Sequence, residues 1–317
     1  MNFNNKIYVA GHLGMVGSAI VKQLNQEGYT NIVYKTKKEL NLTRQEQVHN
    51  FLDAEKPDYV VVAAAKVGGI YANNNYPAEF IYQNLMIETN LIHGSYLAGI
   101  KNLLFLGSSC IYPKESLQPI KEEYLLNGIL EPTNEPYAIS KIAGIKLCES
   151  YNRQYGTNYR SIMPTNLYGP NDNFHLNNSH VIPALIRKFH EAKVNKSPNV
   201  EVWGSGNQLR DFLYVGDMAI ASSYIMNLDN NIVNGFVSSM LSHINVGSGK
   251  EISIKDTSVL IKEIVGYHGN IVFNTNMSDG TNRKLLDTTK IQNLGWKPAI
   301  SFEVGLKKTY SWFLNNH

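Results

Sequence analysis

Lys6-Ile-Tyr-Val-Ala10, followed directly by Gly11-His-Leu-Gly14-Met-Val-Gly17, decides the fold that we expect for this chain. The first stretch is an apolar strand, and the second is a glycine turn that opens a helical pattern from Ser18 to Leu24. Glycines permit a tight turn and let the backbone approach a pyrophosphate at the positive end of a helix. The pattern therefore predicts a dinucleotide site. Its residues are Gly11, His12, Leu13, Gly14, Met15, Val16 and Gly17.

Strands and helices alternate along the first half of the chain. Apolar runs at 31–35, 59–64, 103–108 and 159–163 indicate strands, and helical patterns at 45–52, 79–97 and 137–155 separate them. This alternation predicts an α/β protein with a Rossmann-type, doubly wound parallel sheet. Ligands of such sheets bind at the carboxyl ends of the strands. The predicted ends are Gly11, Lys37, Ala65, Ser108 and Thr165.

The pattern changes after Pro170. Residues 171–179 are polar, and we expect Ser179 to cap a helix that runs to about Ala192, with Pro183 in its first turn. We expect residues 1–168 to form the dinucleotide-binding domain and 212–246 to return to it. The remaining segments, 169–211 and 247–317, are then a smaller α/β lobe for the substrate.

Composition narrows the function classes. The chain has 317 residues, of which 43% are hydrophobic, so it can bury a large core. A net charge of +3, from 29 basic and 26 acidic residues, gives no reason to expect a nucleic acid or a membrane as partner. Two cysteines make no disulfide framework, and the N-terminus resembles no signal peptide. We expect a cytoplasmic α/β protein.

The end of the second predicted strand bears on the choice of cofactor. NAD-binding folds usually place an acidic residue there, which holds the ribose 2′-hydroxyl. This chain has Lys35, Lys37 and Lys38 instead, and Glu39 is the nearest acid. Together the lysines favour a 2′-phosphate and hence NADP, although a solvated basic loop would explain each of them singly.

Tyr137-Ala-Ile-Ser-Lys141 places a phenol one helical turn ahead of an ammonium. A neighbouring cation lowers the pKa of a tyrosine, so Lys141 is expected to make Tyr137 a better general acid. The spacing is common on helix surfaces and is weak evidence alone. It gains weight from Ser108-Ser109-Cys110, which adds polar, reactive groups at the end of a buried strand.

The C-terminal half holds scattered basic residues and an aromatic residue that suit an anionic, nucleotide-linked substrate. Any one of them alone would be explained by ordinary surface charge. The candidates are Lys188, Trp203, Arg210, Asp279 and Lys284.

Longer strings resemble the GDP-L-fucose synthases, a family of extended short-chain dehydrogenase/reductases, nearly from end to end. The most specific are Gly107-Ser-Ser-Cys-Ile-Tyr-Pro-Lys114 and Asn178-Ser-His-Val-Ile-Pro-Ala184. Ala63-Ala-Ala-Lys-Val-Gly-Gly-Ile70, Glu131-Pro-Thr-Asn-Glu-Pro-Tyr-Ala138 and Arg283-Lys-Leu-Leu-Asp287 agree with them. The resemblance implies an NADPH-dependent 3,5-epimerase and 4-reductase that acts on GDP-4-keto-6-deoxy-D-mannose.

The resemblance also implies roles for single residues. Cys110 and His180 match the two epimerisation residues, and both side chains exchange protons near neutral pH. Ser108 and Tyr137 would stabilise negative charge on O4, and Lys141 would hold the nicotinamide ribose. No metal is implied. The cofactor-binding residues beyond the glycine turn and the lysines are Leu106, Gly107, Ser108, Lys141, Pro164, Thr165, Asn166, Leu167 and His180.

Three positions depart from the family pattern or from simple expectation. Leu13 stands where some members have an arginine near the 2′-phosphate, and Lys188 stands where we expect an arginine on the diphosphate. His180 lies near a helix N-terminus, where the helix dipole disfavours an imidazolium. Which of Cys110 and His180 is the base stays open at this point.

Two other functions compete. Another nucleotide-sugar enzyme of this type, a 4-epimerase or a 4,6-dehydratase, is disfavoured. A dehydratase needs a carboxylic acid where Ser109 and Cys110 stand, and a simple 4-epimerase needs no cysteine and histidine pair. A non-catalytic NADP-sensing protein would have no need for Ser108, Tyr137 and Lys141. The family resemblance also implies a homodimer, which we expect to form through the helices at 79–97 and 137–155.

Overall fold

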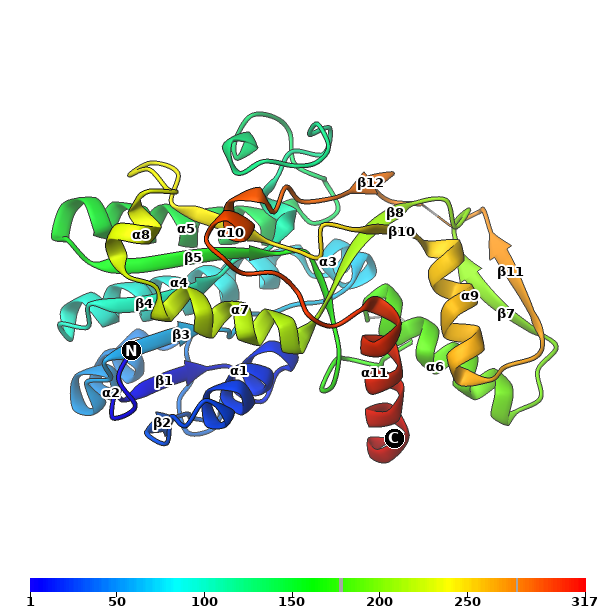
Figure 1. Cartoon of the computed structure of the whole chain (residues 1–317), viewed down its shortest axis with the longest axis horizontal. Helices are drawn as coiled ribbons and strands as arrows, with labels where there is room; N and C mark the ends of the chain where they lie inside the picture. Colours follow the sequence, from blue (N-terminus) through cyan, green and yellow to red (C-terminus); the bar gives the residue numbers. More distant parts are fainter. Residues whose placement is uncertain (177–178, 278) are drawn as a thin grey trace.

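A computed structural model describes residues 1–176, 179–277 and 279–317. A six-stranded sheet with every pair of neighbours parallel forms its larger part, in the order β2-β1-β3-β4-β5-β9 (Figure 1). The strands are β1 (Ile7–Ala10), β2 (Ile32–Val33), β3 (Tyr59–Val62), β4 (Asn102–Leu106), β5 (Asn158–Pro164) and β9 (His243–Val246). The predicted fold class, a Rossmann-type doubly wound sheet, is confirmed.

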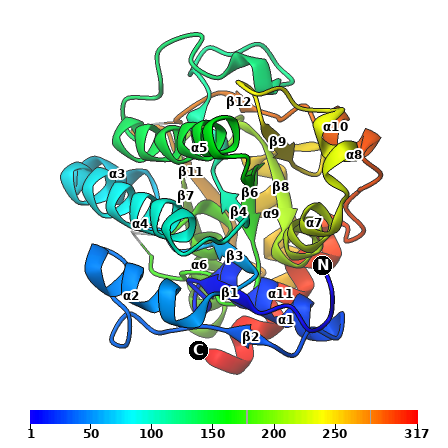
Figure 2. The same ribbon diagram turned by 90° about the vertical axis from the view of Figure 1, so that its left-hand side faces the viewer.

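Helices cover both faces of this sheet, as Figure 2 shows in a view along the strands. On one face lie α2 (Gln45–Glu55), α4 (Pro77–Leu97) and α5 (Glu135–Tyr155). On the other lie α1 (Met15–Gln26) and α7 (Val215–Asn227), which pack against each other. The short elements α3 (Ile70–Asn75), α8 (Asn230–Asn234), α10 (Thr289–Asn293), η1 (Ser109–Ile111) and η2 (Glu122–Tyr124) occur in the connections.

Each face of the sheet has its own hydrophobic core, because side chains of a strand alternate between its two sides. Tyr8, Val60 and Phe105 contribute to the core under α2, α4 and α5. Ile7, Val61 and Leu104 contribute to the core under α1 and α7. All six are at most 1% exposed, which explains why these strands are continuous apolar runs in the sequence.

A smaller part with a separate core lies beside the carboxyl edge of the large sheet (Figure 1). It contains α6 (Val181–Val194), α9 (Ile254–Val265) and α11 (Phe302–Asn316). One small sheet pairs β7 (Asn199–Trp203) with β11 (Asn270–Asn274). The other contains β6 (Asn166–Tyr168), β8 (Leu209–Tyr214), β10 (Glu251–Ser253) and β12 (Arg283–Lys284). The chain crosses between the two parts several times, so residues distant in sequence meet at the carboxyl edge.

One expectation at this edge is wrong. His180, not Ser179, occupies the N-cap position of α6, and its side chain makes no capping hydrogen bond. Ser179 instead donates its backbone N–H to the carbonyl oxygen of His175. Pro183 does lie in the first turn of α6, as predicted, where a missing N–H costs nothing. Within the described residues, no helix has the length and hydropathy of a membrane span.

Candidate active site

The glycine turn joins β1 to α1 at the centre of the carboxyl edge. Gly11 has φ +89°, and a Cβ on it would lie 2.7 Å from the backbone of Ala64 after β3. A Cβ on Gly17 would lie 2.1 Å from the carbonyl oxygen of Gly11, so helix and turn touch only because both residues are glycine. The first turn of α1 has no acidic residue and no side-chain cap. Its free N–H groups can therefore donate hydrogen bonds to a phosphate.

The remaining turn residues and the lysines surround this helix start. The His12 imidazole stacks on Tyr34, with ring centroids 4.5 Å apart, and its buried Nδ1 has no hydrogen-bond partner among the described residues. Leu13 is 70% exposed. Lys35 is half-buried and Lys37 is exposed, and both follow the short strand β2. These positions fit a dinucleotide that extends from the glycine turn towards the end of β2.

The end of β4 leads into a tight 3₁₀ turn that carries Ser108 and Cys110. The hydroxyl of Ser108 accepts a hydrogen bond from the backbone N–H of Cys110 at 3.3 Å. Leu106 and Gly107 precede it, and Gly107 donates its N–H to the carbonyl oxygen of Ile162 on β5. The turn thus fixes both reactive side chains relative to the sheet.

Tyr137 and Lys141 lie one turn apart on α5, as the spacing predicts, but the electrostatics differ from expectation. Burial raises the pKa of Tyr137 well above its usual range, the charges of Cys110 and Glu88 raise it further, and the hydroxyl of Ser108 opposes them. The expected lowering of this pKa by Lys141 is therefore wrong. The main reason is burial of the phenol, and the charge of Cys110 comes next. Glu88 on α4 adds to them, and its carboxylate lies 2.8 Å from the Lys141 ammonium.

Two polar side chains contact the sulfur of Cys110. The side-chain amide of Asn134 donates to it at 3.4 Å, and the ammonium of Lys284 on β12 approaches to 3.6 Å. The His180 imidazole is accessible to solvent, yet the surrounding protein, followed by the charge of Lys284, lowers its pKa. The structure thus brings Cys110 and Lys284 together. The charge of Lys284 also acts on His180.

The segment after β5 is hydrogen-bonded to β8. Thr165 and Asn166 both donate their side-chain hydrogen bonds to the carbonyl oxygen of Asp211 on β8, at 3.0 and 2.9 Å. Pro164 ends β5, and Leu167 packs beside the α1–α7 core. These hydrogen bonds link the end of β5 to β8 at the edge where a dinucleotide would lie.

Four of the five predicted substrate residues form two groups, and the fifth, Lys284, lies beside Cys110. The Lys188 ammonium lies 4.8 Å from the centre of the Trp203 ring and donates to the carbonyl oxygen of Glu201. Asp279 accepts hydrogen bonds from the backbone N–H and hydroxyl of Ser205, and its charge acts on Arg210. Asn178, which we quoted in a family string, lies outside the described residues.

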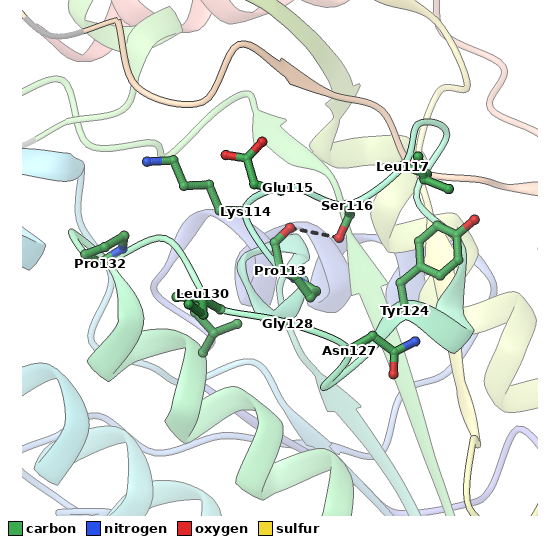
Figure 3. Close-up of a pocket in the computed structure, with 11 residues that line it drawn as sticks. Pro113, Lys114, Glu115, Ser116, Leu117, Tyr124, Asn127, Gly128, Leu130 and Pro132 are labelled. Atoms are coloured by element: carbon green, nitrogen blue, oxygen red, sulfur yellow. Dashed lines mark hydrogen bonds between the residues drawn. The ribbon is translucent and has the colours of Figure 1, made fainter.

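A pocket of about 500 Å³ lies in the loop between η1 and α5. Figure 3 shows its lining, which includes Leu117, Tyr124 and Leu130, and the hydrogen bond from the Ser116 hydroxyl to the carbonyl oxygen of Pro113. The pocket is mostly apolar, and none of the residues predicted for the site lines it. We therefore place the candidate site at the carboxyl edge of the large sheet and not in this loop.

Comparison with known proteins identifies the family of the chain. Residues 7–247 match the model of the NAD dependent epimerase/dehydratase family. The chain belongs to this family. Among the relatives is the GDP-L-fucose synthase of Escherichia coli (strain K12), which is 58% identical over 311 residues, or 98% of this chain and 97% of the relative.

Two solved structures of this epimerase/dehydratase fold resemble the whole chain. A GDP-6-OMe-4-keto-L-xylo-heptose reductase from C. jejuni has a TM-score of 0.95 and 40% identity, and the match covers 100% of this chain and 99% of that one. A GDP-L-fucose synthetase from Naegleria fowleri bound to NADP has a TM-score of 0.89 and 28% identity, with 100% and 96% covered.

The sequence did not reveal two residues of this epimerase/dehydratase site. Asn134 appears in the quoted string Glu131–Ala138, but nothing in the spacing indicates that its amide reaches Cys110 from the N-cap of α5. In the helical pattern at 79–97, Glu88 shares its face with the apolar residues Leu85, Leu91 and Ile92. A single acid on such a face is a usable signal, because carboxylates are rarely buried without a charged partner.

Proposed function

We propose that this chain is a GDP-L-fucose synthase, which epimerises GDP-4-keto-6-deoxy-D-mannose at C3 and C5 and reduces it at C4 with NADPH. The observation that carries the proposal is that two sets of residues are linked around the turn after β4: the Ser108 hydroxyl acts on Tyr137, and Lys284 contacts Cys110 and acts on His180. Ser108, Tyr137 and Lys141 suit carbonyl reduction, whereas Cys110 and His180 suit proton exchange. The 58% identity to the E. coli GDP-L-fucose synthase supports the same substrate.

Epimerisation begins because the 4-keto group acidifies the C–H bonds at C3 and C5. Lys284 and Asn134 beside the Cys110 sulfur stabilise negative charge there, which suits a thiolate base. His180 returns a proton from the other side of the ring, and its lowered pKa makes the imidazolium a stronger acid. Ser108 and Tyr137 donate hydrogen bonds to the enolate oxygen.

Reduction follows in the same pocket. NADPH, when bound, supplies the hydride that C4 receives. The glycine turn and the first turn of α1 hold its pyrophosphate, and Lys35 and Lys37 meet the 2′-phosphate. Tyr137 gives its proton to O4. Lys188, Trp203, Arg210 and Asp279 lie on the smaller part of the molecule, where they bind the GDP portion.

A reductase that leaves C3 and C5 unchanged is the alternative favoured by a specific observation. The heptose reductase from C. jejuni has almost the same fold, so fold alone does not separate the two activities. Incubation of the protein with GDP-4-keto-6-deoxy-D-mannose and NADPH separates them. We expect consumption of NADPH and GDP-L-fucose as the product. A sugar reduced at C4 with unchanged C3 and C5 would favour the alternative, and no consumption would contradict both.

We also propose that the protein is a homodimer that associates through α4 and α5. Large apolar side chains on these helices are exposed, among them Tyr82 (61%) and Leu97 (57%) on α4 and Ile139 (40%) on α5. Sedimentation should give a dimer for the wild type and a larger monomer fraction for Tyr82→Glu. Leu314→Glu on α11, which changes another exposed apolar side chain (52%), is the control and should stay dimeric.

A further inference from the structure

The ammonium of Lys141 is enclosed by other side chains. It lies 2.8 Å from Glu88 Oε1, and the side chains of Lys141 and Glu88 are only 2% and 1% exposed. The ring of Phe105 on β4 lies beneath it, with the centroid 4.9 Å away, and the Tyr137 ring is 5.9 Å away. Glu88 is thus the only anionic partner of Lys141 among the described residues that lies within ion-pair distance.

Glu88 in turn depends on Lys141. Neither carboxylate oxygen has an aligned hydrogen-bond partner in the described part of the chain, so the ion pair is the main favourable contact of this buried charge. Burial raises the pKa of Glu88, and Lys141 opposes the rise. Buried ion pairs of this kind seldom add net stability, because desolvation offsets the attraction between the charges. A function for the pair is therefore the better explanation of its presence.

The position of Glu88 matters for the proton on Tyr137. The titratable groups that interact with its charge are Lys141, Tyr137 and Cys148, all on α5. An isolated ammonium near Tyr137 would favour the phenolate, whereas a carboxylate beside that ammonium cancels most of the effect. Carbonyl reduction requires the protonated phenol, since the phenol is the proton donor.

Building on the roles given above to Tyr137 and Lys141, we propose that Glu88 is a positioning residue of the reductase centre. It holds the Lys141 ammonium against Phe105 and balances its charge. This adds to burial and to the charge of Cys110, which also favour the protonated form of Tyr137. Glu88 acts through Lys141 and does not touch the substrate. Nothing in its role requires it to take part in proton exchange at C3 or C5.

The pH profile of reduction tests this role. In Glu88→Gln the carboxylate charge is lost, so the alkaline limb of the profile should move to lower pH by about one unit. Glu88→Asp keeps the carboxylate charge, but its side chain is one methylene shorter and holds that charge farther from Lys141. The alkaline limb should therefore also move to lower pH, but by a smaller amount. Glu149→Gln is the matched control. Glu149, on α5, is a buried glutamate like Glu88 and pairs with Lys146 at 2.7 Å. It should lower the melting temperature without moving the limb.

A second readout needs no substrate. The ultraviolet absorbance of phenolate is followed as the pH is raised, in the wild type and in Glu88→Gln. The same curve is measured for each protein with Tyr137→Phe added. The difference between the two curves of a pair reports the ionisation of Tyr137. We expect this difference to appear at lower pH in Glu88→Gln. If the wild type reduces no GDP-sugar, the proposed function fails, but this titration still judges Glu88. A folded Glu88→Gln protein with an unmoved Tyr137 titration would overturn the inference; if that variant does not fold, an unmoved titration in Glu88→Asp would do so.

Discussion

At the scale of single residues, the site depends on which charges stand next to the reactive groups. The sequence predicts that Tyr137 and Lys141 are neighbours, and the structure confirms this. It does not predict the buried Glu88, which lies 53 positions earlier than Lys141 on a different helix. Helical spacing reports contacts within one helix only. It reveals neither the burial of Tyr137, which is the main cause of its raised pKa, nor the charges of Cys110 and Glu88, which add to it.

Tyr137→Phe removes the proton donor and keeps the ring. We expect reduction to slow by roughly 10²–10⁴-fold, because the alkoxide at C4 then lacks a positioned acid. Binding of NADPH, followed by its fluorescence, should be unchanged. Tyr124→Phe, in the loop pocket of Figure 3, is the control. Wild-type turnover in Tyr137→Phe would show that another group donates the proton.

Lys35→Ala together with Lys37→Ala tests the choice of cofactor. Both residues follow β2, and loss of two charge-assisted contacts with a 2′-phosphate should raise the KM for NADPH about tenfold or more. The KM for NADH should change little, because NADH has no such phosphate. Lys101→Ala, an exposed lysine just before β4, is the control. An equal loss for both cofactors would mean that the two lysines have a structural role.

At the scale of elements, a buried polar network fastens β9 to the loop that follows η1. The Tyr112 hydroxyl lies 3.1 Å from His243 Nε2 and donates to Asn245 Oδ1 at 2.5 Å. The Asn245 amide donates to the carbonyl oxygen of Ile120. None of these links is visible in the sequence, because they join residues more than 120 positions apart. The order of strands and helices, by contrast, follows from local patterns and is predicted well.

This network predicts a pH dependence of stability. Burial, followed by the charges of Lys290 and Lys146, lowers the pKa of His243 to about 3. An unfolded histidine has a pKa of about 6.5, so below that pH the unfolded chain takes up a proton that the folded protein excludes. This histidine's stabilising contribution is therefore complete above about pH 6.5 and decreases as the pH falls towards 3, by up to ~1.4 kcal/mol per pH unit.

His243→Gln removes this titration. Its melting temperature should be lower at neutral pH, since the network is disturbed, but should fall less than that of the wild type between about pH 6.5 and 4. The pKa of Asp211 is raised to about 6, so its contribution to stability changes with pH in the opposite direction to that of His243. Both proteins contain Asp211, so its effect cancels in the comparison. His268→Gln, at an exposed position, is the control. A parallel decline of His243→Gln and wild type would contradict the assignment.

At the scale of the whole molecule, the site exists because the chain crosses repeatedly between its two parts. Ser108 and Cys110 come from the end of β4, His180 from the start of α6, and Lys284 from β12. The rule that ligands bind at the carboxyl ends of parallel strands predicts where the first two lie. The rule does not predict the position of Lys284, which we expected to bind substrate. Lys284 lies on β12 in a separate small sheet, and its ammonium approaches the Cys110 sulfur from there.

Exchange of solvent deuterium into the keto sugar tests most directly whether two chemistries share this site. In deuterium oxide without NADPH, the wild type should place deuterium at C3 and C5 of GDP-4-keto-6-deoxy-D-mannose. Cys110→Ala should fold, bind NADPH and lose this exchange, while Cys148→Ala, which removes the other thiol, should keep it. Exchange in Cys110→Ala as fast as in the wild type would contradict the account, because the proton shuttle would then lie elsewhere.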